Sequence, residues 1–374
     1  MNAAPRPRLL LIGPRPRPGE PIGGTQVSFS ELCENFRASG AFELDLVDTT
    51  RPNAYSSGWR RRLSDARGLM STLWALLRRG RRADLVMFNA SSGGLMAAGP
   101  WVSRLCAWLD RPLVLRAFGG ALDLAYDAAN ASKRTALEQS LRAASLVLLQ
   151  TEHLCARFAD FGVVRKLPTT RRVPARVRAR SRRCRRFVFI SQLRPEKGLA
   201  DALRAIELCP RECTLAIYGP SLPQTDLLAL RSHSRAVYHG ALPHEHVPRV
   251  LADHDALVFP SYHEGEGMPG VVVEALQCGL PVIAARWRSL GELVHDEECG
   301  LLVPARAPEE LAVAMTRLVN DDALYAELCV GAAERGRELD ANLWHRRLES
   351  WLYALCGGAQ RDVGVAANYN EVSP

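Results

Sequence analysis

The feature that most constrains the fold is an alternation of short apolar runs with amphipathic stretches, which occurs in two successive series. Short, near-continuous apolar runs are typical of strands that are buried on both faces. The runs of the first series lie at 9–12, 44–47, 85–88, 113–115 and 146–149. The runs of the second series lie at 187–190, 215–218, 256–259 and 282–285.

The stretches between these runs have the periodicity of crossover helices, clearest at 27–36, 133–144, 199–208 and 271–278. Alternating strands and helices form a parallel sheet that helices cover on both faces. The sequence therefore predicts an α/β fold of two doubly wound, Rossmann-like domains in tandem. Since ligands bind such sheets at the carboxyl ends of the strands, the loops after strands that face the cleft are the candidates for a site.

The boundary between the domains is predicted at 165–186, where the apolar periodicity stops and eleven Lys or Arg occur without an acid. We expect an N-terminal domain at 1–164, a basic linker at 165–186 and a C-terminal domain at 187–340. Residues 341–358 predict a C-terminal helix that could cross back to the first domain. The polar residues 359–374 predict a flexible tail.

The formal net charge of +8 is concentrated in two segments. One is 165–186; the other, 59–82, holds eight Arg and one Asp, so the rest of the chain has a net charge of −10. Because 165–186 lacks interleaved aromatic residues, we expect no nucleic-acid partner. The segment 59–82 interleaves its arginines with Trp, Leu and Met, which predicts either docking on anionic lipid headgroups or an ordinary helix that packs its apolar side inward.

Ten cysteines are spread along the chain, and only Cys209 and Cys213 are close together, without a second pair at zinc spacing. Most lie in apolar contexts, which predicts free structural thiols in a reducing cytoplasm. No apolar run reaches the length of about 18 residues that a membrane-spanning helix requires. The run at 9–12 is too short for the core of a secretory signal.

The first candidate loop, residues 13–25, follows the first predicted strand. Gly23 and Gly24 allow the backbone to approach a ligand closely, and Thr25 is a candidate N-cap of the next helix. Amide groups at a helix N-terminus attract anions. The alternative is a long turn whose glycines only relieve strain.

The second candidate loop, residues 191–198, opens the second series of strands. It places Arg194 and Lys197 above a strand end, and this pair of cations suits a diphosphate, since Lys supplies a point charge and Arg a fork. The alternative is a solvated turn with a weak surface pair between Glu196 and Lys197.

The third candidate loop, residues 260–274, holds Glu266 and Glu274 on either side of a helix start near Pro269. Both carboxylates could accept hydrogen bonds from vicinal hydroxyls, while the amides of 267–271 could bind an anion or sugar oxygens. The alternatives are a solvated loop acid and a helix-surface acid. A glycine-rich acidic segment between an apolar strand and an apolar helix favours a ligand.

The same loop also fits a dinucleotide-binding pattern. Its sequence from Gly265 to Gly270 is G-E-G-M-P-G, and Glu292 lies about twenty residues further on, as that pattern requires. Against this interpretation, Glu266 would repel a pyrophosphate, Pro269 removes a donor, and the strand lies in the middle of its domain. An NAD-dependent Rossmann enzyme remains the rival hypothesis.

With these residues in view, the second half of the chain resembles glycosyltransferase family 4, the retaining family of glycosyl transferases group 1 with the two-domain GT-B fold. The resemblance covers about 187–335 and rests on FVFISQLRPEKG, YGP, HGAL, FPSYHEGEGMPGVVVEALQCGLPVIA and CGLLVPARAPEELAVAM. In the first half it is weaker and rests on IGGTQ and PLVLRAFGGALD. It implies an acceptor-binding domain at 1–164 and a nucleotide-sugar-binding domain at 187–340.

The resemblance also implies roles for individual residues. Glu274 would bind the ribose, Glu266 the transferred sugar, and Lys197 with Arg194 the diphosphate. The residues that it places around the donor are Gly23, Gly24, Gly219, Gly240, Leu242, Gly267, Met268, Pro269, Gly270, Val271 and Glu274. Those on the acceptor side are Thr25, Arg116, Gly119 and Gly120.

The chain departs from the family pattern at two places. Gln192 stands where the family commonly has an arginine, and Arg194 could substitute from two residues further along. The segment from Arg116 to Gly120 reads R-A-F-G-G and has no histidine, so backbone groups and Arg116 would contact the sugar. These departures motivate an alternative: a catalytically silent GT-B scaffold that binds a nucleotide-sugar.

The leading hypothesis is a retaining hexosyltransferase that builds a bacterial-type surface polysaccharide or lipid-linked oligosaccharide at the inner face of the cell membrane. Lys197, Arg194 and a helix N-terminus would stabilise the departing diphosphate. We therefore expect neither a metal nor another cofactor. Asp253-His-Asp255 precedes a buried strand and predicts a turn rather than a metal site.

Overall fold

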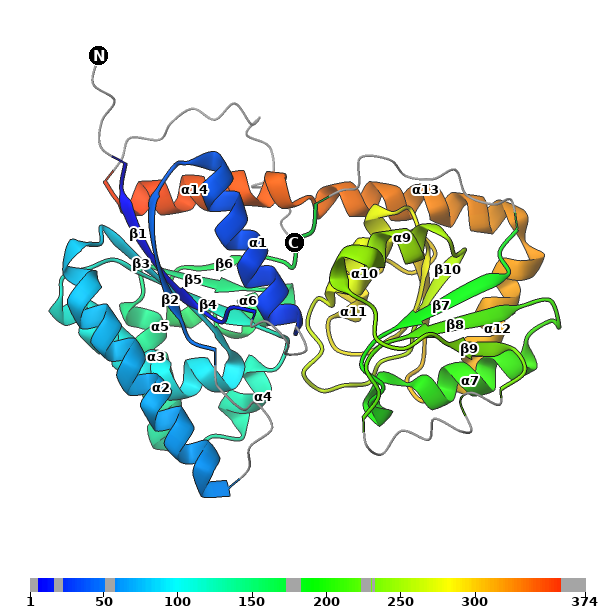
Figure 1. Ribbon diagram of the computed structural model, residues 1–374, viewed down its shortest axis with the longest axis horizontal. Helices are drawn as coiled ribbons and strands as arrows, with labels where there is room; N and C mark the ends of the chain where they lie inside the picture. Colours follow the sequence, from blue (N-terminus) through cyan, green and yellow to red (C-terminus); the bar gives the residue numbers. More distant parts are fainter. Residues whose placement is uncertain are drawn as a thin grey trace, which may run out of the picture.

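The computed structural model describes residues 6–16, 23–50, 58–172, 183–222, 230 and 233–357. Two parallel sheets lie in separate halves of the molecule, and each has helices on both faces (Figure 1). The predicted α/β fold with two doubly wound domains is confirmed. The predicted tail, 359–374, lies outside the described residues.

The sheet of the first domain has the strand order β2-β1-β3-β4-β5-β6, and all its pairings are parallel. Its strands are β1 (Arg8–Gly13), β2 (Glu43–Asp48), β3 (Leu85–Ser91), β4 (Leu113–Phe118), β5 (Leu146–Leu149) and β6 (Val164–Lys166). Its helices are α1 (Gly24–Ser39), α2 (Gly58–Arg79), α3 (Ser92–Trp108), α4 (Leu122–Asp127), α5 (Ala131–Ala143) and α6 (Glu152–Arg157), with short 3-10 helices at Gly80–Arg82 and Ala159–Phe161.

The sheet of the second domain has the order β12-β11-β10-β7-β8-β9 and is also parallel. Its strands are β7 (Arg186–Ile190), β8 (Thr214–Tyr218), β9 (Ala236–Tyr238), β10 (Ala256–Phe259), β11 (Val282–Ala285) and β12 (Gly300–Val303). Around it lie α7 (Leu199–Leu208), α9 (Val247–Ala252), α10 (Gly270–Gln277), α11 (Leu290–Leu293), α12 (Pro308–Asn320) and α13 (Asp322–Glu338), with 3-10 helices η3 (Pro195–Lys197) and η4 (His244–His246).

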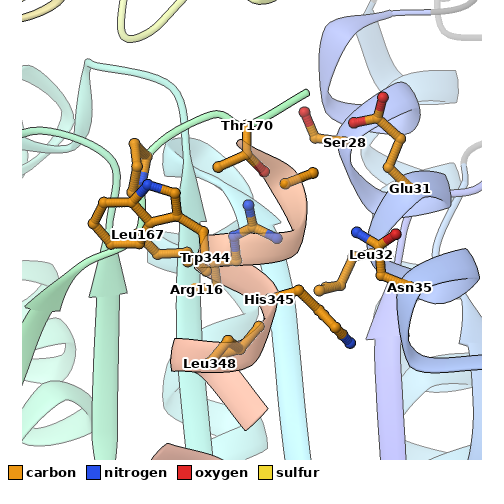
Figure 2. A pocket seen from close by; sticks show the side chains of 12 residues that line it. Ser28, Glu31, Leu32, Asn35, Arg116, Leu167, Thr170, Trp344, His345 and Leu348 are labelled. Carbon is orange, nitrogen blue, oxygen red and sulfur yellow. The ribbon is translucent and has the colours of Figure 1, made fainter. Parts of the chain in front are cut away.

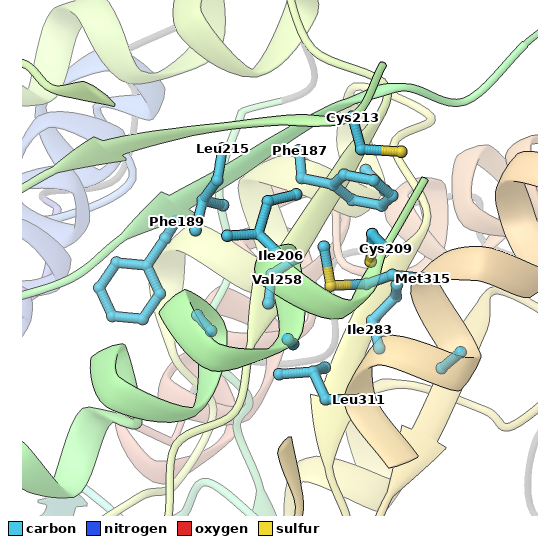
Figure 3. Packing of buried hydrophobic residues seen from close by; sticks show 14 of the residues in the cluster. Phe187, Phe189, Ile206, Cys209, Cys213, Leu215, Val258, Ile283, Leu311 and Met315 are labelled. Atoms are coloured by element: carbon cyan, nitrogen blue, oxygen red, sulfur yellow. The ribbon is translucent and has the colours of Figure 1, made fainter. Parts of the chain in front are cut away.

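The strand β7 shows how alternation builds both cores of the second domain. Phe187 and Phe189 point to one face, where they join Ile206 of α7 and Met315 of α12 in one cluster (Figure 3). Val188 belongs to the cluster on the other face, beneath α10. Since successive side chains of a strand point to opposite faces, a strand covered on both faces is apolar throughout.

Three strands were not predicted, and all three lie at an edge of a sheet. They are short: β6 and β9 have three residues each and β12 has four. β6 and β9 are covered incompletely, so their sequences carry a weaker apolar signal, whereas β12 is mostly buried and differs from the predicted strands in neither length nor apolarity. In β9, for example, Val237 is 55% exposed.

The predicted linker is too long at both ends. Its first residues, 165 and 166, belong to β6, and its last residue, Arg186, begins β7. Residues 173–182 lie outside the described part of the chain. The described part of the linker runs beside the start of the last helix, where the amide of Ala341 donates to the carbonyl of Arg171 at 2.9 Å.

The last helix, α14 (Ala341–Leu355), carries the chain back onto the first domain (Figure 1). Its side chains Leu348 and Leu352 are fully buried in a core cluster with Phe29 and Phe36 of α1. Asp340 caps the helix by accepting from the amides of residues 342 and 343. The two domains are therefore joined twice, by the linker and by the passage from α13 to α14.

Candidate active site

Loops of both domains enclose a cavity of about 260 Å³ at the carboxyl ends of the strands. The first domain contributes the start of α1 and the loop after β4, and the second contributes the loop after β10. The lining residues are Gly24, Thr25, Ser28, Phe118, Gly119, Gln150, Thr169, Arg171, His263, Gly265, Glu266, Gly267, Met268, Pro269 and Gly270. The structure thus brings together predicted residues from both domains in one cavity.

The loops after β4 and β10 meet backbone to backbone. The amide of Gly120 donates to the carbonyl of Gly265 at 3.2 Å. A Cβ atom on Gly120 would lie 2.1 Å from the carbonyl oxygen of Glu266, and one on Gly267 would lie 2.8 Å from the nitrogen of Gly120. Glycine is therefore required at both positions for this approach of the two domains.

The predicted cation Lys197 and the predicted acid Glu266 form an ion pair. The Nζ atom of Lys197 lies 2.7 Å from Oε2 of Glu266, and the side chains are only 14% and 8% exposed. The hydroxyl of Ser261, a fully buried residue that the sequence did not single out, donates to the same carboxylate oxygen. Lys197 ends η3, and Gly198 follows it with φ +75°, where a Cβ atom would lie 2.3 Å from the carbonyl of Pro260.

Arg194 lies apart from this pair. Its guanidinium contacts Glu196 at 3.3 Å, its side chain is 43% exposed, and it does not line the cavity. The alternative, a solvated turn with a surface pair between Glu196 and Lys197, is wrong, because Lys197 pairs with the buried carboxylate of Glu266. An exposed ion pair such as Arg194–Glu196 contributes little to stability.

Glu274 lies in the second turn of α10 and is 7% exposed. Its Oε1 atom accepts from Nε of Arg171 at 3.0 Å and lies 3.5 Å from Nδ1 of His244. Burial raises the pKa of this carboxyl above its ordinary value, and the charges of Arg171 and His244 oppose that shift. Glu274 is therefore bound by Arg171 and lies beside His244, and sequence reasoning missed both of these partners.

Arg171 contacts both domains at the hinge, the place where the linker runs beside the start of α14. Besides Glu274 of α10, its guanidinium contacts Glu31 and Ser28 of α1, at 3.0 and 3.3 Å. A Cβ atom on Gly270 would lie 2.2 Å from its Nη2 atom, so glycine at the start of α10 makes room for it. Nothing in the sequence distinguishes Arg171 from the ten other cations of the basic segment.

The two turns predicted beside the nucleobase lie next to each other. The amide of Gly219 donates to the carbonyl of Gly240 at 2.8 Å. The hydroxyl of Tyr238 donates to the carbonyl of Gly219 at 2.9 Å. Leu242 and Val271 are both partly buried and pack against the core cluster beneath α10. Two residues after Leu242, Nδ1 of His244 lies 3.5 Å from Oε1 of Glu274.

Two predicted features are wrong. Gly23, not Thr25, is the N-cap of α1, and its amide donates to the side chain of Gln26 at 2.8 Å. Arg116 does not line the cavity between the domains. It points from β4 into a smaller cavity between α1 and α14, because its side chain shares the sheet face of Val114 and Phe118 (Figure 2).

Sequence reasoning also missed His263, whose imidazole lines the cavity. Burial, together with the charge of Lys197, lowers the pKa of this group. An uncharged ring nitrogen can accept or donate one hydrogen bond. The first domain lacks the histidine that the family pattern has, and here an imidazole reaches the cavity from the second domain.

Glu292, the acid of the dinucleotide-binding pattern, forms hydrogen bonds between the two domains. Oε2 and Oε1 of Glu292 accept from the amides of Glu152 and His153, at 2.6 and 3.0 Å. These amides open α6 of the first domain, where a negative charge is favourable. Glu292 is thus engaged away from any ribose, which removes the main support of the NAD hypothesis.

Asp255 of the Asp-His-Asp sequence has a structural partner. Its Oδ2 atom accepts from the amides of Arg185 and Arg186 at 3.0 and 2.8 Å, which anchors β7. Within the described ranges, no group of three His, Cys, Asp or Glu side chains is arranged to hold a metal ion. None of the described helices combines the length and apolarity that crossing a membrane requires.

The ten cysteines all lie in the described residues, and none forms a disulfide. Most are buried, and burial raises the pKa of several thiols, to about 11 for Cys33 and about 12 for Cys106. Thiols with such pKa values are unreactive at neutral pH. The predicted free structural thiols are therefore present.

Residues 184–321 match the family Glycosyl transferases group 1. The second domain is therefore similar to this family, and the two facing parallel sheets have the GT-B fold. The resemblance on which the site prediction rests is confirmed for this part of the chain.

Curated relatives cover the same part. The chain is 34% identical over 179 residues to the D-inositol 3-phosphate glycosyltransferase of Rhodococcus opacus, a match of 44% of this chain and 39% of that protein. It is 28% identical over 144 residues to the O-antigen chain mannosyltransferase B of Escherichia coli, 36% of this chain and 37% of that protein. The chain thus spans less than half the length of the curated relatives it matches.

Solved structures resemble the whole fold. Sucrose-phosphate synthase of Thermosynechococcus elongatus superposes with a TM-score of 0.75 at 20% identity, over 94% of this chain and 100% of that chain. HepE of Anabaena, solved in complex with UDP-glucose, gives 0.69 at 18% identity, over 92% and 99%. At such identities the likeness concerns the fold.

Proposed function

We propose that the chain is a retaining glycosyltransferase that moves a hexose from a nucleotide-sugar to a hydroxyl of a polysaccharide or lipid-linked oligosaccharide. The observation that carries the proposal is the buried ion pair between Lys197 and Glu266, of which Glu266 lines the cavity between the domains and Lys197 lies behind it. It places a cation for phosphate and an acceptor for sugar hydroxyls 2.7 Å apart, within the segment that matches the family.

The charges of the reaction fit this pair. Cleavage of the bond between the sugar and the diphosphate leaves the electron pair on the phosphate oxygen, and positive charge develops on the anomeric carbon. We expect the diphosphate to take over the ammonium of Lys197, which frees the carboxylate of Glu266 to accept from sugar hydroxyls. The amides at the start of α10 would add to the stabilisation. In this proposal Lys197 and the amides of α10 stabilise the negative charge of the departing diphosphate, and the reaction needs no metal.

The nucleoside would lie on the other side of the same loop. Glu274 would accept from the ribose hydroxyls, and the turns at Gly219 and Gly240 would flank the base. Since HepE was solved with UDP-glucose, uridine donors are the first to test. In a retaining reaction the acceptor oxygen attacks the anomeric carbon on the same face from which the diphosphate departs. The contact between the loops that carry Gly120 and Gly267 would exclude water from this face.

We further propose that the first domain docks on anionic membrane, at the inner face of the cell membrane. On α2 and α3 the tryptophans Trp74, Trp101 and Trp108 are 59%, 52% and 65% exposed. Each has an arginine guanidinium within 6 Å of its ring, from Arg78, Arg104 and Arg81 respectively. Amphipathic aromatic rings beside cations suit the headgroup region. The opposite face of α2 packs against the core of the first domain, where Leu76 is fully buried. One face of the helix is therefore packed inside the domain, and the other is free to contact a membrane.

The test is turnover of a labelled donor. The purified chain is mixed with UDP-, GDP-, ADP- and TDP-sugars, with membrane extract as acceptor, and transfer of the labelled sugar is measured. We expect transfer from one donor class, and Lys197→Ala lowers its rate about 100-fold or more, the usual effect of removing one group that stabilises developing charge. Lys133→Ala, an exposed lysine of α5, is the control.

The outcomes separate the hypotheses. A raised melting temperature with one nucleotide-sugar but no transfer would favour the silent scaffold. Transfer that Lys197→Ala leaves unchanged would refute the roles assigned here. A response of tryptophan fluorescence to NADH and none to any nucleotide-sugar would restore the NAD hypothesis.

A further inference from the structure

A second cavity lies away from the candidate active site, between α1, α14 and residues 167–170 (Figure 2). Its volume is about 30 Å³, and its lining includes Ser28, Glu31, Arg116, Thr170 and His345. Ser28 borders both this cavity and the cavity between the domains. Four parts of the chain therefore line it: α1, Arg116 of β4, residues 167–170 and α14.

Arg116 is the unusual member of this lining. Its side chain comes from the middle of β4, and the residue is only 5% exposed. Its Nε atom is buried without a hydrogen-bond partner among the described residues, and its guanidinium carbon lies 4.6 Å from the ring centroid of Phe118. In Figure 2 the guanidinium points into the space bordered by Thr170, Trp344 and His345.

The acids near the cavity are already engaged. Glu31 contacts Nη1 of Arg171 at 3.0 Å, and Glu349 contacts the ring of His345 at 2.9 Å. Burial, and the like charge of Arg171, lower the pKa of Arg116 to about 10, so it still carries its charge at neutral pH. A buried charge without a directly bonded partner is unfavourable, and such a group normally coordinates a counter-ion.

We propose that this cavity binds a small inorganic oxyanion of the phosphate or sulfate class, held by the guanidinium of Arg116 with the hydroxyls of Thr170 and Ser28. Guanidinium recognises such oxyanions through its fork of N–H donors. A volume of about 30 Å³ holds about two water molecules, which suits a small inorganic anion better than a sugar phosphate. The proposal is independent of the transferase activity.

The test measures the melting temperature against inorganic phosphate at constant ionic strength, with saturating UDP present so that the candidate active site is blocked. We expect phosphate to raise the melting temperature of the parent by about 2–5 °C near saturation. Lys197→Ala should keep this rise, Arg116→Met should lose it, and Arg116→Lys should show a smaller one. Glucose 6-phosphate should give no rise.

The variant Arg116→Met also tests the charge argument without phosphate. Because it removes an unpaired buried charge and keeps the apolar stem, it should melt at or above the temperature of the parent in phosphate-free buffer. If it melts lower, Arg116 serves as a distant counter-charge to Glu31, and the proposal fails. The proposal also fails if the phosphate effect survives in Arg116→Met, vanishes in Lys197→Ala, is matched by glucose 6-phosphate or is absent in the parent.

Discussion

At the scale of single residues, the site depends on glycines that allow two loops from different domains to touch. Gly24 lines the cavity between the domains, and Gly120 follows Gly119, which also lines it, yet the surroundings of Gly24 and Gly120 differ. A Cβ atom on Gly120 would overlap the carbonyl of Glu266, whereas one on Gly24 would meet no atom within 4 Å. The two positions therefore form a matched pair for substitution.

We expect Gly120→Ala to lower the free energy of unfolding by about 1–3 kcal/mol, the usual effect of forcing an extra methyl group into packed structure. Gly24→Ala, at the first position of α1, should change it little or raise it slightly, because alanine favours helix. Urea denaturation of both variants checks this. Equal effects of the two substitutions would contradict the close contact of the loops.

The raised pKa of Glu274 has a consequence for the dependence of stability on pH. The folded state holds the proton of this carboxyl to a higher pH than the unfolded chain does, so this group's contribution to stability falls as pH rises above the ordinary pKa of 4.5. Glu274→Gln removes that contribution. We therefore expect the melting temperature of Glu274→Gln relative to the parent to rise as the pH rises above about 4.5.

Thermal melts of both proteins across that range provide the measurement. Glu309→Gln, at an exposed acid of α12, is the control and should follow the parent. A difference between Glu274→Gln and the parent that shrinks as pH rises would show that Arg171 and His244 outweigh the burial of the carboxyl.

At the scale of elements, the sequence predicted the strands and helices that have a clear apolar pattern. It did not predict contacts between side chains that are far apart in the chain. The central strands are apolar because helices cover both faces, so they appear in the sequence, whereas the edge strands β6 and β9 do not. In the site, Lys197 and Glu266 could be predicted because each follows a strand end within one loop. Arg171 and His244 could not, since only the folded hinge brings them to Glu274.

The contact between Glu292 and α6 is a second such case, because its partners are about 140 residues away in the chain. We expect Glu292→Ala to cost about 1 kcal/mol of stability, the range of an acid at a helix N-terminus. More importantly, it should loosen the two domains and increase the radius of gyration in X-ray scattering. Glu310→Ala, an acid in the first turn of α12 within one domain, should leave the radius unchanged.

At the scale of the whole molecule, the C-terminal helix α14 follows the second domain in the sequence but packs on the first domain. The last helix completes the core of the first domain, and the passage from α13 to α14 runs beside the linker at Arg171 (Figure 1). The sequence indicated a helix at 341–358 but could not decide where it packs, because its apolar stripe fits either domain. The structure resolves this through Leu348 and Leu352, which lie against α1.

It follows that a substitution near the C-terminus should destabilise the N-terminal domain. Leu348→Ala removes a side chain that is 1% exposed from the cluster with Phe36, and we expect a loss of about 2–5 kcal/mol. Hydrogen exchange should rise in β1 and α1 and stay unchanged in β7 and α7. Val330→Ala in α13, at a side chain 60% exposed, is the control and should change stability by less than about 0.5 kcal/mol. Faster exchange in β7 instead of β1 would place α14 with the second domain and contradict the packing described here.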